Sequence, residues 1–322
     1  MSIRHCNLAF TPAVWGCVTA RTGPGMAAAG IRSAHRWFGA RGLAIGILIA
    51  ATLSGCSTVR VAYPQLDWLI ANRIDGYVRL THEQRKVVND HIDAILAWHC
   101  RTQLGDYATW LRRVRSDFSH GITAAELDDH IAALEDGWRT LMQRLVPVGV
   151  EVLSTLRDDQ VAQFLGSIEE NNGAYRKQYV ESAESTWRRT NRTWMEKAVR
   201  RGLGELTRDQ QHAISAWVNA IVPTREIGWA ERMRWQQAFR SLLDRRHDRQ
   251  ALADGLTRLL VYWDYHRGET YRRIHAHNRD QLAALLISIS RTATPRQKRY
   301  LKSRIEGYAR DFDALACGSG PA

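Results

Sequence analysis

Residues 123–146, TAAELDDHIAALEDGWRTLMQRLV, decide the fold class of this 322-residue chain. Their apolar residues recur at alternating steps of four and three, the spacing of a helical seam that packs on other helices. Segments 104–118 and 301–315 repeat this spacing, and no segment shows the sustained period-two alternation of a strand. The sequence therefore predicts an all-α, multi-helix array of long antiparallel helices with coiled-coil-like packing. The first seam consists of Leu127, Ile131, Leu134, Trp138, Leu141 and Leu145.

A short motif opens several of the expected helices. Thr81, Thr207 and Thr294 each stand three residues before a Gln, where the threonine is an N-cap that accepts a backbone N–H. Thr123 forms a capping box with Glu126. Residues 156–160, LRDDQ, are a degenerate copy without the threonine. The intervals are irregular, which indicates a recurring start signal and not a fixed-period solenoid.

Proline and glycine residues separate the expected helices. Pro147, the segment 202–204 and Pro223 mark the breaks. Residues 169–173, EENNG, are polar all round, so we expect them to be solvated or kinked. The expected helices span residues 65–78, 81–103, 104–119, 123–146, 149–201, 207–222, 225–246, 248–291 and 294–315.

The N-terminal segment has the layout of an export signal. Residues 1–55 contain five Arg and no Asp or Glu, and all five Arg precede an apolar run from Gly42 to Leu53. The run is about a dozen residues long, whereas a membrane-spanning helix needs roughly 20. We therefore predict a cleaved signal peptide over residues 1–55, for which Met26 offers an alternative start.

The apolar run ends in Leu53-Ser54-Gly55-Cys56, which resembles the lipobox of bacterial lipoproteins. The resemblance implies cleavage between Gly55 and Cys56, followed by lipidation of the Cys56 thiol. Ser57 stands where Asp favours inner-membrane retention in similar lipoproteins, so an outer-membrane location facing the periplasm is implied. We accordingly predict a lipidated linker over 56–64, a helical domain over 65–317 and a disordered tail over 318–322.

Removal of the leader would lower the net positive charge of the chain. The full sequence has 45 Lys plus Arg against 33 Asp plus Glu, a net charge of +12. Loss of the five leader Arg leaves 40 against 33, or +7. In the basic run 187–201, Trp187 and Trp194 lie seven residues apart and share a helical face, which favours core packing over base stacking. We therefore expect no nucleic-acid partner.

The exported part resembles a family of uncharacterised proteobacterial lipoproteins known only as a domain of unknown function. The resemblance is carried by residues 56–60 (CSTVR), 62–63 (AY), 66–69 (LDWL) and 75–84 (DGYVRLTHEQ), and a familiar helix follows over 297–315. It implies an all-helical periplasmic body but no activity. A looser resemblance, through the repeated Leu-Thr-x-x-Gln helix starts, is to small periplasmic stress chaperones.

Cys100 and Cys317 are an even pair in a chain expected in the oxidising periplasm. A disulfide between them would close a loop of about 217 residues and stabilise the fold by roughly 5 kcal/mol on the chain-entropy model. Two separate buried thiols are an equally good interpretation, and the sequence leaves both open.

Motifs that carry catalysis or metal binding are absent from the sequence. It contains no His-Glu-x-x-His, phosphate-binding loop, Gly-x-Ser-x-Gly or Cys-x-x-Cys. His275 and His277 point to different sides of a helix, and Glu126 with His130 is best interpreted as a solvated surface pair. We therefore predict no catalytic residue, no metal site and no cofactor.

These observations favour a binding protein of the cell envelope. We expect an outer-membrane-anchored lipoprotein whose helical body acts as a scaffold or adaptor. Its expected partners are the membrane, through the lipid, and an envelope protein, an anionic lipid or an anionic wall polymer. The alternatives are a lipid-tethered periplasmic chaperone and an envelope hydrolase.

Overall fold

The computed structural model describes residues 58–262 and 267–317, which form an all-α structure without strands. The signal peptide, Cys56 and the tail 318–322 lie outside the described residues. The α-helices are α2 (Thr58–Ala62), α3 (Leu66–Asp75), α4 (His82–Thr102), α5 (Leu104–His120), α6 (Ala124–Ser154), α7 (Asp158–Tyr175), α8 (Glu184–Leu203), α9 (Arg208–Ala220), α10 (Arg225–Asp244), α11 (Arg249–Leu256), α12 (Glu269–Thr292) and α13 (Pro295–Leu315). A 3₁₀ helix, η1 (Tyr63–Gln65), and two π-helical segments, η2 (Arg176–Val180) and η3 (Thr257–Val261), connect some of them.

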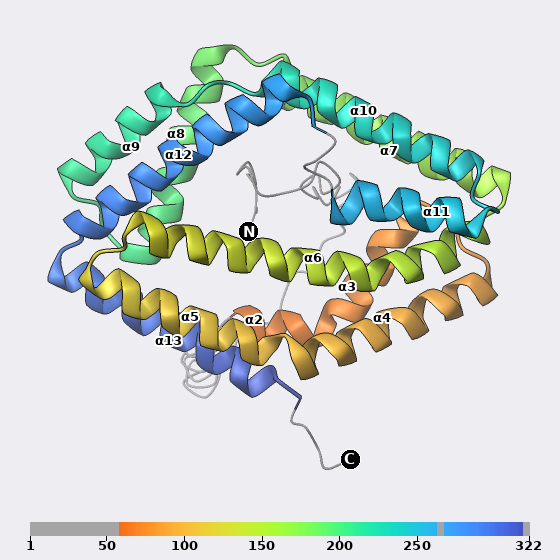
Figure 1. Ribbon diagram of the computed structural model, residues 1–322, viewed down its shortest axis with the longest axis horizontal. Coiled ribbons are helices and arrows are strands. Elements are labelled where there is room, and N and C mark those ends of the chain that lie inside the picture. The colour runs from red at the N-terminus through yellow and green to blue at the C-terminus, as the bar shows by residue number, and fades with distance from the viewer. Residues whose placement is uncertain (1–57, 263–266, 318–322) are drawn as a thin grey trace, which may run out of the picture.

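The helices are arranged around α6, which runs lengthwise through the molecule (Figure 1). One end of the molecule holds α8, α9 and α12, and the other holds α7, α10 and α11. Helices α4, α5 and α13 lie along the other side of α6, with α5 packed on α13. Within the described residues, no helix is both long and apolar enough to cross a membrane.

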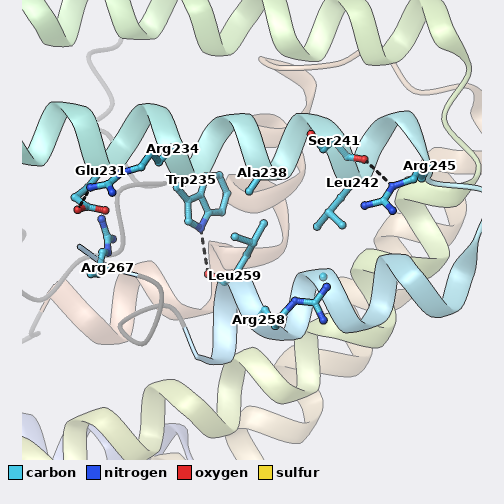
Figure 2. Close-up of a pocket in the computed structure, with 11 residues that line it drawn as sticks. Glu231, Arg234, Trp235, Ala238, Ser241, Leu242, Arg245, Arg258, Leu259 and Arg267 are labelled. Carbon is cyan, nitrogen blue, oxygen red and sulfur yellow. Dashed lines mark hydrogen bonds and ion pairs between the residues drawn. The ribbon is translucent and has the colours of Figure 1, made fainter. Parts of the chain in front are cut away.

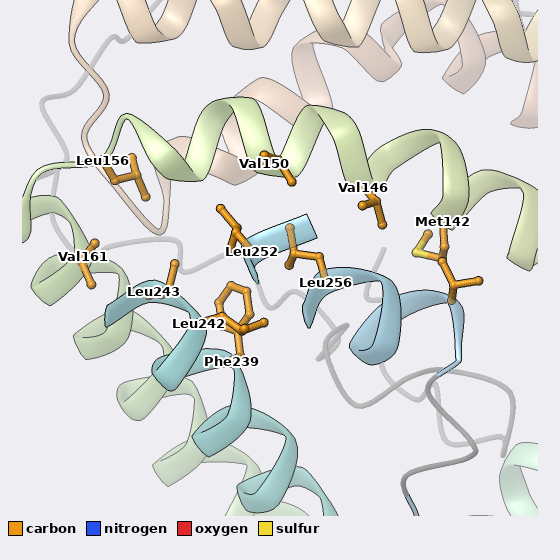
Figure 3. Packing of buried hydrophobic residues seen from close by; sticks show 11 residues of the cluster. Met142, Val146, Val150, Leu156, Val161, Phe239, Leu242, Leu243, Leu252 and Leu256 are labelled. Carbon is orange, nitrogen blue, oxygen red and sulfur yellow. The ribbon is translucent and has the colours of Figure 1, made fainter. Parts of the chain in front are cut away.

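The molecule has two hydrophobic cores, one at each end. The first core joins α6, α7, α10, α11 and η3 around Leu243 and Leu252, whose side chains are fully buried (Figure 3). The second joins α8, α9 and α12 around Ile214 and Val218. Full burial of one such aliphatic side chain contributes about 1.5–3 kcal/mol, so each core can order its own set of helices.

The seam in α6 differs from its expected burial. Leu127 is buried, but Leu134 is 50% exposed and residues 132–136 are all exposed. In the C-terminal half of α6, Trp138, Leu141 and Leu145 of the seam are partly buried against the first core. The fully buried residues are Met142, Val146 and Val150, on a face shifted by one position from the predicted seam. The reason is that α6 contacts different helices at its two ends, whereas a coiled coil has one partner along its whole length.

The predicted helix starts are confirmed, and their glutamines do more than cap. Thr81, Thr207 and Thr294 each form a complete capping box with the Gln three residues later. These glutamines also meet in pairs across the fold. Gln210 and Gln297, both buried, exchange two amide hydrogen bonds of 3.0 Å. Gln84 pairs in the same way with Gln160 of the degenerate start, at 2.7 and 3.1 Å.

Several expected helix boundaries were wrong. Pro147 does not end α6, because its exposed ring sacrifices one backbone hydrogen bond while buried neighbours hold the helix on both sides. The expected helix 149–201 is interrupted at 155–157 and again at 181–183. The first interruption is the degenerate start itself, where Leu156 is buried and the Gln160 side chain accepts the Arg157 N–H. The expected helix 248–291 likewise divides into α11, η3 and α12.

The expected linker over residues 56–64 is helical from Thr58 onward. Arg60 lies 3.8 Å from the Asp311 carboxylate of α13, and the Tyr63 hydroxyl is hydrogen-bonded to His99 Nδ1 at 3.0 Å. Polar contacts to α4 and α13 therefore fix this segment to the body.

Candidate functional site

A hollow of about 380 Å³ lies between α10 and the segment formed by α11 and η3 (Figure 2). We call it the arginine pocket, because Arg234, Arg245, Arg258 and Arg267 all line it. Arg258 comes from the helix that faces α10, so basic side chains enter the hollow from both sides. The remaining lining residues are Glu231, Trp235, Ala238, Ser241, Leu242, Gly255 and Leu259.

The close approach of α11 to α10 forms the floor of the arginine pocket. A Cβ atom at Gly255 would overlap the Leu242 side chain, so glycine is required for the two helices to pack at this distance. The indole Nε1 of Trp235 donates a 3.1 Å hydrogen bond to the Leu259 carbonyl in η3. A π-helical segment often marks a functional site, and here it places Arg258 opposite α10.

The described lining residues carry a net positive charge. They include four arginines and one carboxylate, Glu231, a formal excess of three positive charges. Glu231 is 2% exposed, forms an ion pair with Arg234 and accepts the Gly268 N–H at 3.0 Å. Because this carboxylate is satisfied by those two donors, the exposed guanidinium groups of Arg245 and Arg258 remain to attract an anion.

A buried polar cluster behind the pocket sets the rotation of α10. Arg232 donates from Nε to the Asn172 side chain at 2.8 Å, and its guanidinium lies 4.9 Å from the Tyr175 ring centroid. Asn172 also donates to Gln236 at 2.6 Å. Burial lowers the pKa of Arg232 and raises the pKa of the Tyr175 hydroxyl. Asn172 belongs to the segment 169–173 that we expected to be solvated. The other four residues of the segment are exposed as expected, but Asn172 is buried because it packs on α10.

Cys100 and Cys317 form a disulfide, with their Cα atoms 5.2 Å apart. The Cys317 N–H also donates to the Cys100 carbonyl at 3.2 Å. Of the two interpretations that the sequence left open, the structure contains the disulfide. It links the end of α4 to the residue pair that follows α13, and α13 itself contacts α2. The lipidation and cleavage residues Cys56 and Gly55 lie outside the described residues.

Four other histidines do not converge on one site. His91 pairs with Glu151 at 3.0 Å, and His277 contacts the Ala220 carbonyl at 3.0 Å. His275 stacks on a tyrosine ring of its own helix. Burial lowers the pKa of His99, which stacks on Tyr63.

The interpretation of Glu126 and His130 as a solvated pair was wrong. His130 is 5% exposed, and its Nε2 lies 3.0 Å from the Asp117 carboxylate. Glu126 instead caps Thr123. The helix that precedes the pair in sequence covers His130, and this packing cannot be deduced from the i, i+4 spacing.

The basic run in α8 packs as expected. Trp187 and Trp194 both contact the second core, and the Arg188 guanidinium donates to the Val218 carbonyl at 2.5 Å. Sequence reasoning missed the arginine pocket, because its four arginines are separated by intervals of 11, 13 and 9 residues. The only local signal was the dense basic segment 244–249, which connects α10 to α11.

The fold and the pocket define an all-α protein with a basic, partly apolar pocket suited to an anionic group. The chain belongs to a family of unknown function, DUF6279, which matches residues 76–272. No curated protein and no solved structure matches the chain.

Proposed function

We propose that this protein is a proteobacterial lipoprotein, anchored in the outer membrane through lipid on Cys56 and facing the periplasm. The basic and apolar leader and the Leu53-Ser54-Gly55-Cys56 segment support the anchor. The Cys100–Cys317 disulfide supports an oxidising compartment independently of the leader.

The segment after Cys56 has features that suit a position beside a membrane. Helix α2 starts two residues beyond Cys56, a distance of at most about 7 Å of extended chain. Val61 and Trp68 are each 61% exposed, and Leu69 is 43% exposed. Exposed apolar and tryptophan side chains are favoured where protein meets the headgroup region of a membrane. The lipid would therefore hold α2 and α3 against the bilayer.

The body acts by binding an anionic group of the envelope, and the arginine pocket is the observation that carries this proposal. Its volume falls in the range of small-ligand sites, and it combines guanidinium donors with apolar walls around Trp235. Phosphate and carboxylate are the anions whose geometry matches arginine. A lipid headgroup supplies the first, and an anionic wall polymer supplies either.

Binding is favoured over the two alternatives on specific grounds. The resemblance to chaperones rests on the repeated helix starts, and their glutamines are engaged in capping and pairing within the fold. A hydrolase of the glycosidase type needs two carboxylates that face the substrate. Among the described lining residues of the arginine pocket, the one carboxylate is Glu231, which is already bound by Arg234 and Gly268.

Radioactive palmitate labelling in a proteobacterial host, followed by separation of inner and outer membranes, tests the anchor. The wild-type chain should be labelled and should sediment with the outer membrane. Cys56→Ala should abolish the label, whereas Cys17→Ala, a matched change within the leader, should retain it. Labelling of the Cys56→Ala variant, or recovery of wild-type protein with the inner membrane, would contradict the proposal.

Calorimetric titration of the detergent-solubilised protein tests the pocket. Glycerol phosphate represents a lipid headgroup, and a muropeptide with free carboxylates represents the wall. Arg258→Glu should weaken the affinity for the anion at least about tenfold, the loss expected for one charge-assisted hydrogen bond. Arg192→Glu makes the same charge change on the exposed face of α8 and should have little effect. Equal weakening by both variants would show a nonspecific charge effect and refute the pocket.

A further inference from the structure

The corner between α5 and α6 brings together side chains that bind metals. Gly121 has a φ of 92°, a conformation that glycine adopts freely, and it reverses the chain between the two helices. As a result, Asp117 and His120 at the end of α5 face Glu126 in the first turn of α6. One ligand atom from each of these three residues lies within 4.8 Å of the other two.

The three side chains can close on one ion with small rotations. In a tetrahedral zinc site with bonds of about 2.0–2.2 Å, the ligand atoms are about 3.4 Å apart. His120 is 58% exposed and is therefore able to rotate, and its Nε2 is already 3.9 Å from Glu126 Oε1. The other oxygen of Glu126, Oε2, accepts the Thr123 N–H at 2.8 Å and so fixes the carboxylate in place.

A buried histidine supports the corner from behind. His130 Nε2 lies 3.0 Å from Asp117 Oδ2, and because a carboxylate only accepts, this nitrogen carries the proton. His130 Nδ1 is buried and has no hydrogen-bond partner. Among the described residues, the hydrogen-bond partner of the His130 imidazole is therefore Asp117. The hydrogen bond holds the Asp117 carboxylate at the corner, as outer-shell partners orient the carboxylate ligands of metal sites.

We infer that Asp117, His120 and Glu126 form a binding site for a divalent transition-metal ion, for which Zn²⁺ is the best match, with His130 as a positioning residue. One imidazole nitrogen and two carboxylate oxygens suit zinc, and water would complete the tetrahedron. The bound ion would connect the end of α5 to the start of α6. This inference does not depend on the proposed function.

Two cations from other helices lie at the same corner. Lys298 donates to the Ser119 carbonyl at 3.3 Å, and the stem of Arg291 lies beside Gly121. Their charges oppose a bound cation, so we expect an affinity below that of a structural zinc site with thiolate ligands.

Zinc titration against a chromophoric chelator tests the site directly. The untagged full chain is used, with its free thiols blocked by N-ethylmaleimide. His120→Ala should weaken zinc binding at least about tenfold, because it removes the only imidazole ligand. His91→Ala is the matched control, since His91 also contacts a carboxylate but has no second one nearby, and it should bind zinc like the wild type.

A second variant separates metal binding from folding. Glu126→Gln removes the charge of the ligand. It should preserve the capping box at Thr123, because Gln completes the same kind of box at Thr81, Thr207 and Thr294. It should leave the thermal midpoint without metal nearly unchanged and abolish the rise that zinc produces in the wild type. The inference is overturned if the wild type binds no zinc, or if His120→Ala and His91→Ala bind it equally.

Discussion

Replacing Gln297 by alanine should destabilise the fold far more than its position at the start of a helix suggests. Gln297 is 4% exposed and takes part in three kinds of hydrogen bond. Its Oε1 accepts the Thr294 N–H at 2.9 Å, its Nε2 donates to the Glu205 carbonyl at 2.6 Å, and it exchanges two bonds with Gln210. Alanine would leave the Thr294 N–H, the Glu205 carbonyl and the Gln210 amide without these partners.

The magnitude follows from those three groups. A buried polar group that loses its partner costs about 1–3 kcal/mol, so Gln297→Ala should lower the free energy of unfolding by about 3–5 kcal/mol. Gln210→Ala should lower the free energy of unfolding by less, because the Gln297 amide keeps its hydrogen bond to the Glu205 carbonyl. The double variant leaves no unpaired glutamine in the core. Its cost should therefore fall short of the sum of the two single variants by about 1–3 kcal/mol.

Urea unfolding followed by far-ultraviolet circular dichroism measures these free energies. Gln211→Ala is the control, because Gln211 is the exposed neighbour of Gln210 and its substitution should be nearly neutral. If the costs of the two single variants simply added in the double variant, the glutamines would act only as independent caps, and the reasoning from their pairing would be wrong.

Three further predictions concern packing, the disulfide and pH. Gly255→Ala should cost roughly 1–3 kcal/mol by overlap with Leu242, whereas Gly166→Ala, in open space on α7, should stabilise by roughly 0.5–1 kcal/mol; urea midpoints that move in the same direction would contradict this. Cys317→Ala should lower the free energy of unfolding by up to about 5 kcal/mol. Dithiothreitol should destabilise the wild type but not the variant, because the variant has no Cys100–Cys317 disulfide to reduce. Because burial lowers the pKa of His99, the unfolded chain binds more protons, so stability should fall as the pH drops below the ordinary value of 6.5; His99→Gln should reduce that slope in unfolding curves measured across the range, and an unchanged slope would refute it.

Much of the fold could be predicted from the sequence because helix formation depends on near neighbours. The steps of three and four identified the helices, and the threonine caps located several of their starts correctly. Trp187 and Trp194 were assigned to a core for the same reason. Leu134 and Pro147 are exceptions. For Leu134, the seam predicts an apolar face but not whether a neighbouring helix covers it. For Pro147, the sequence does not show that helix packing on both sides of the proline outweighs the one lost hydrogen bond.

The candidate sites could not be predicted, because they join residues that are distant in sequence. Arg234 and Arg258 belong to different helices, and nothing local to either predicts that they face one hollow. The sequence had placed His130 on the surface, where no reason existed to connect it with Asp117 on the preceding helix.

The sequence by itself determined the all-α class, the caps, the two cysteines available for pairing and the expectation of an exported, lipid-anchored chain. Only the tertiary structure decided that the glutamines pair, that Cys100 meets Cys317, that arginines surround a pocket and that Asp117, His120 and Glu126 meet at one corner. Periodicity and capping act over a few residues along the chain. Pairing, burial and the summation of charge depend instead on which helix surfaces meet in space, and that is settled only when the whole set of helices packs together.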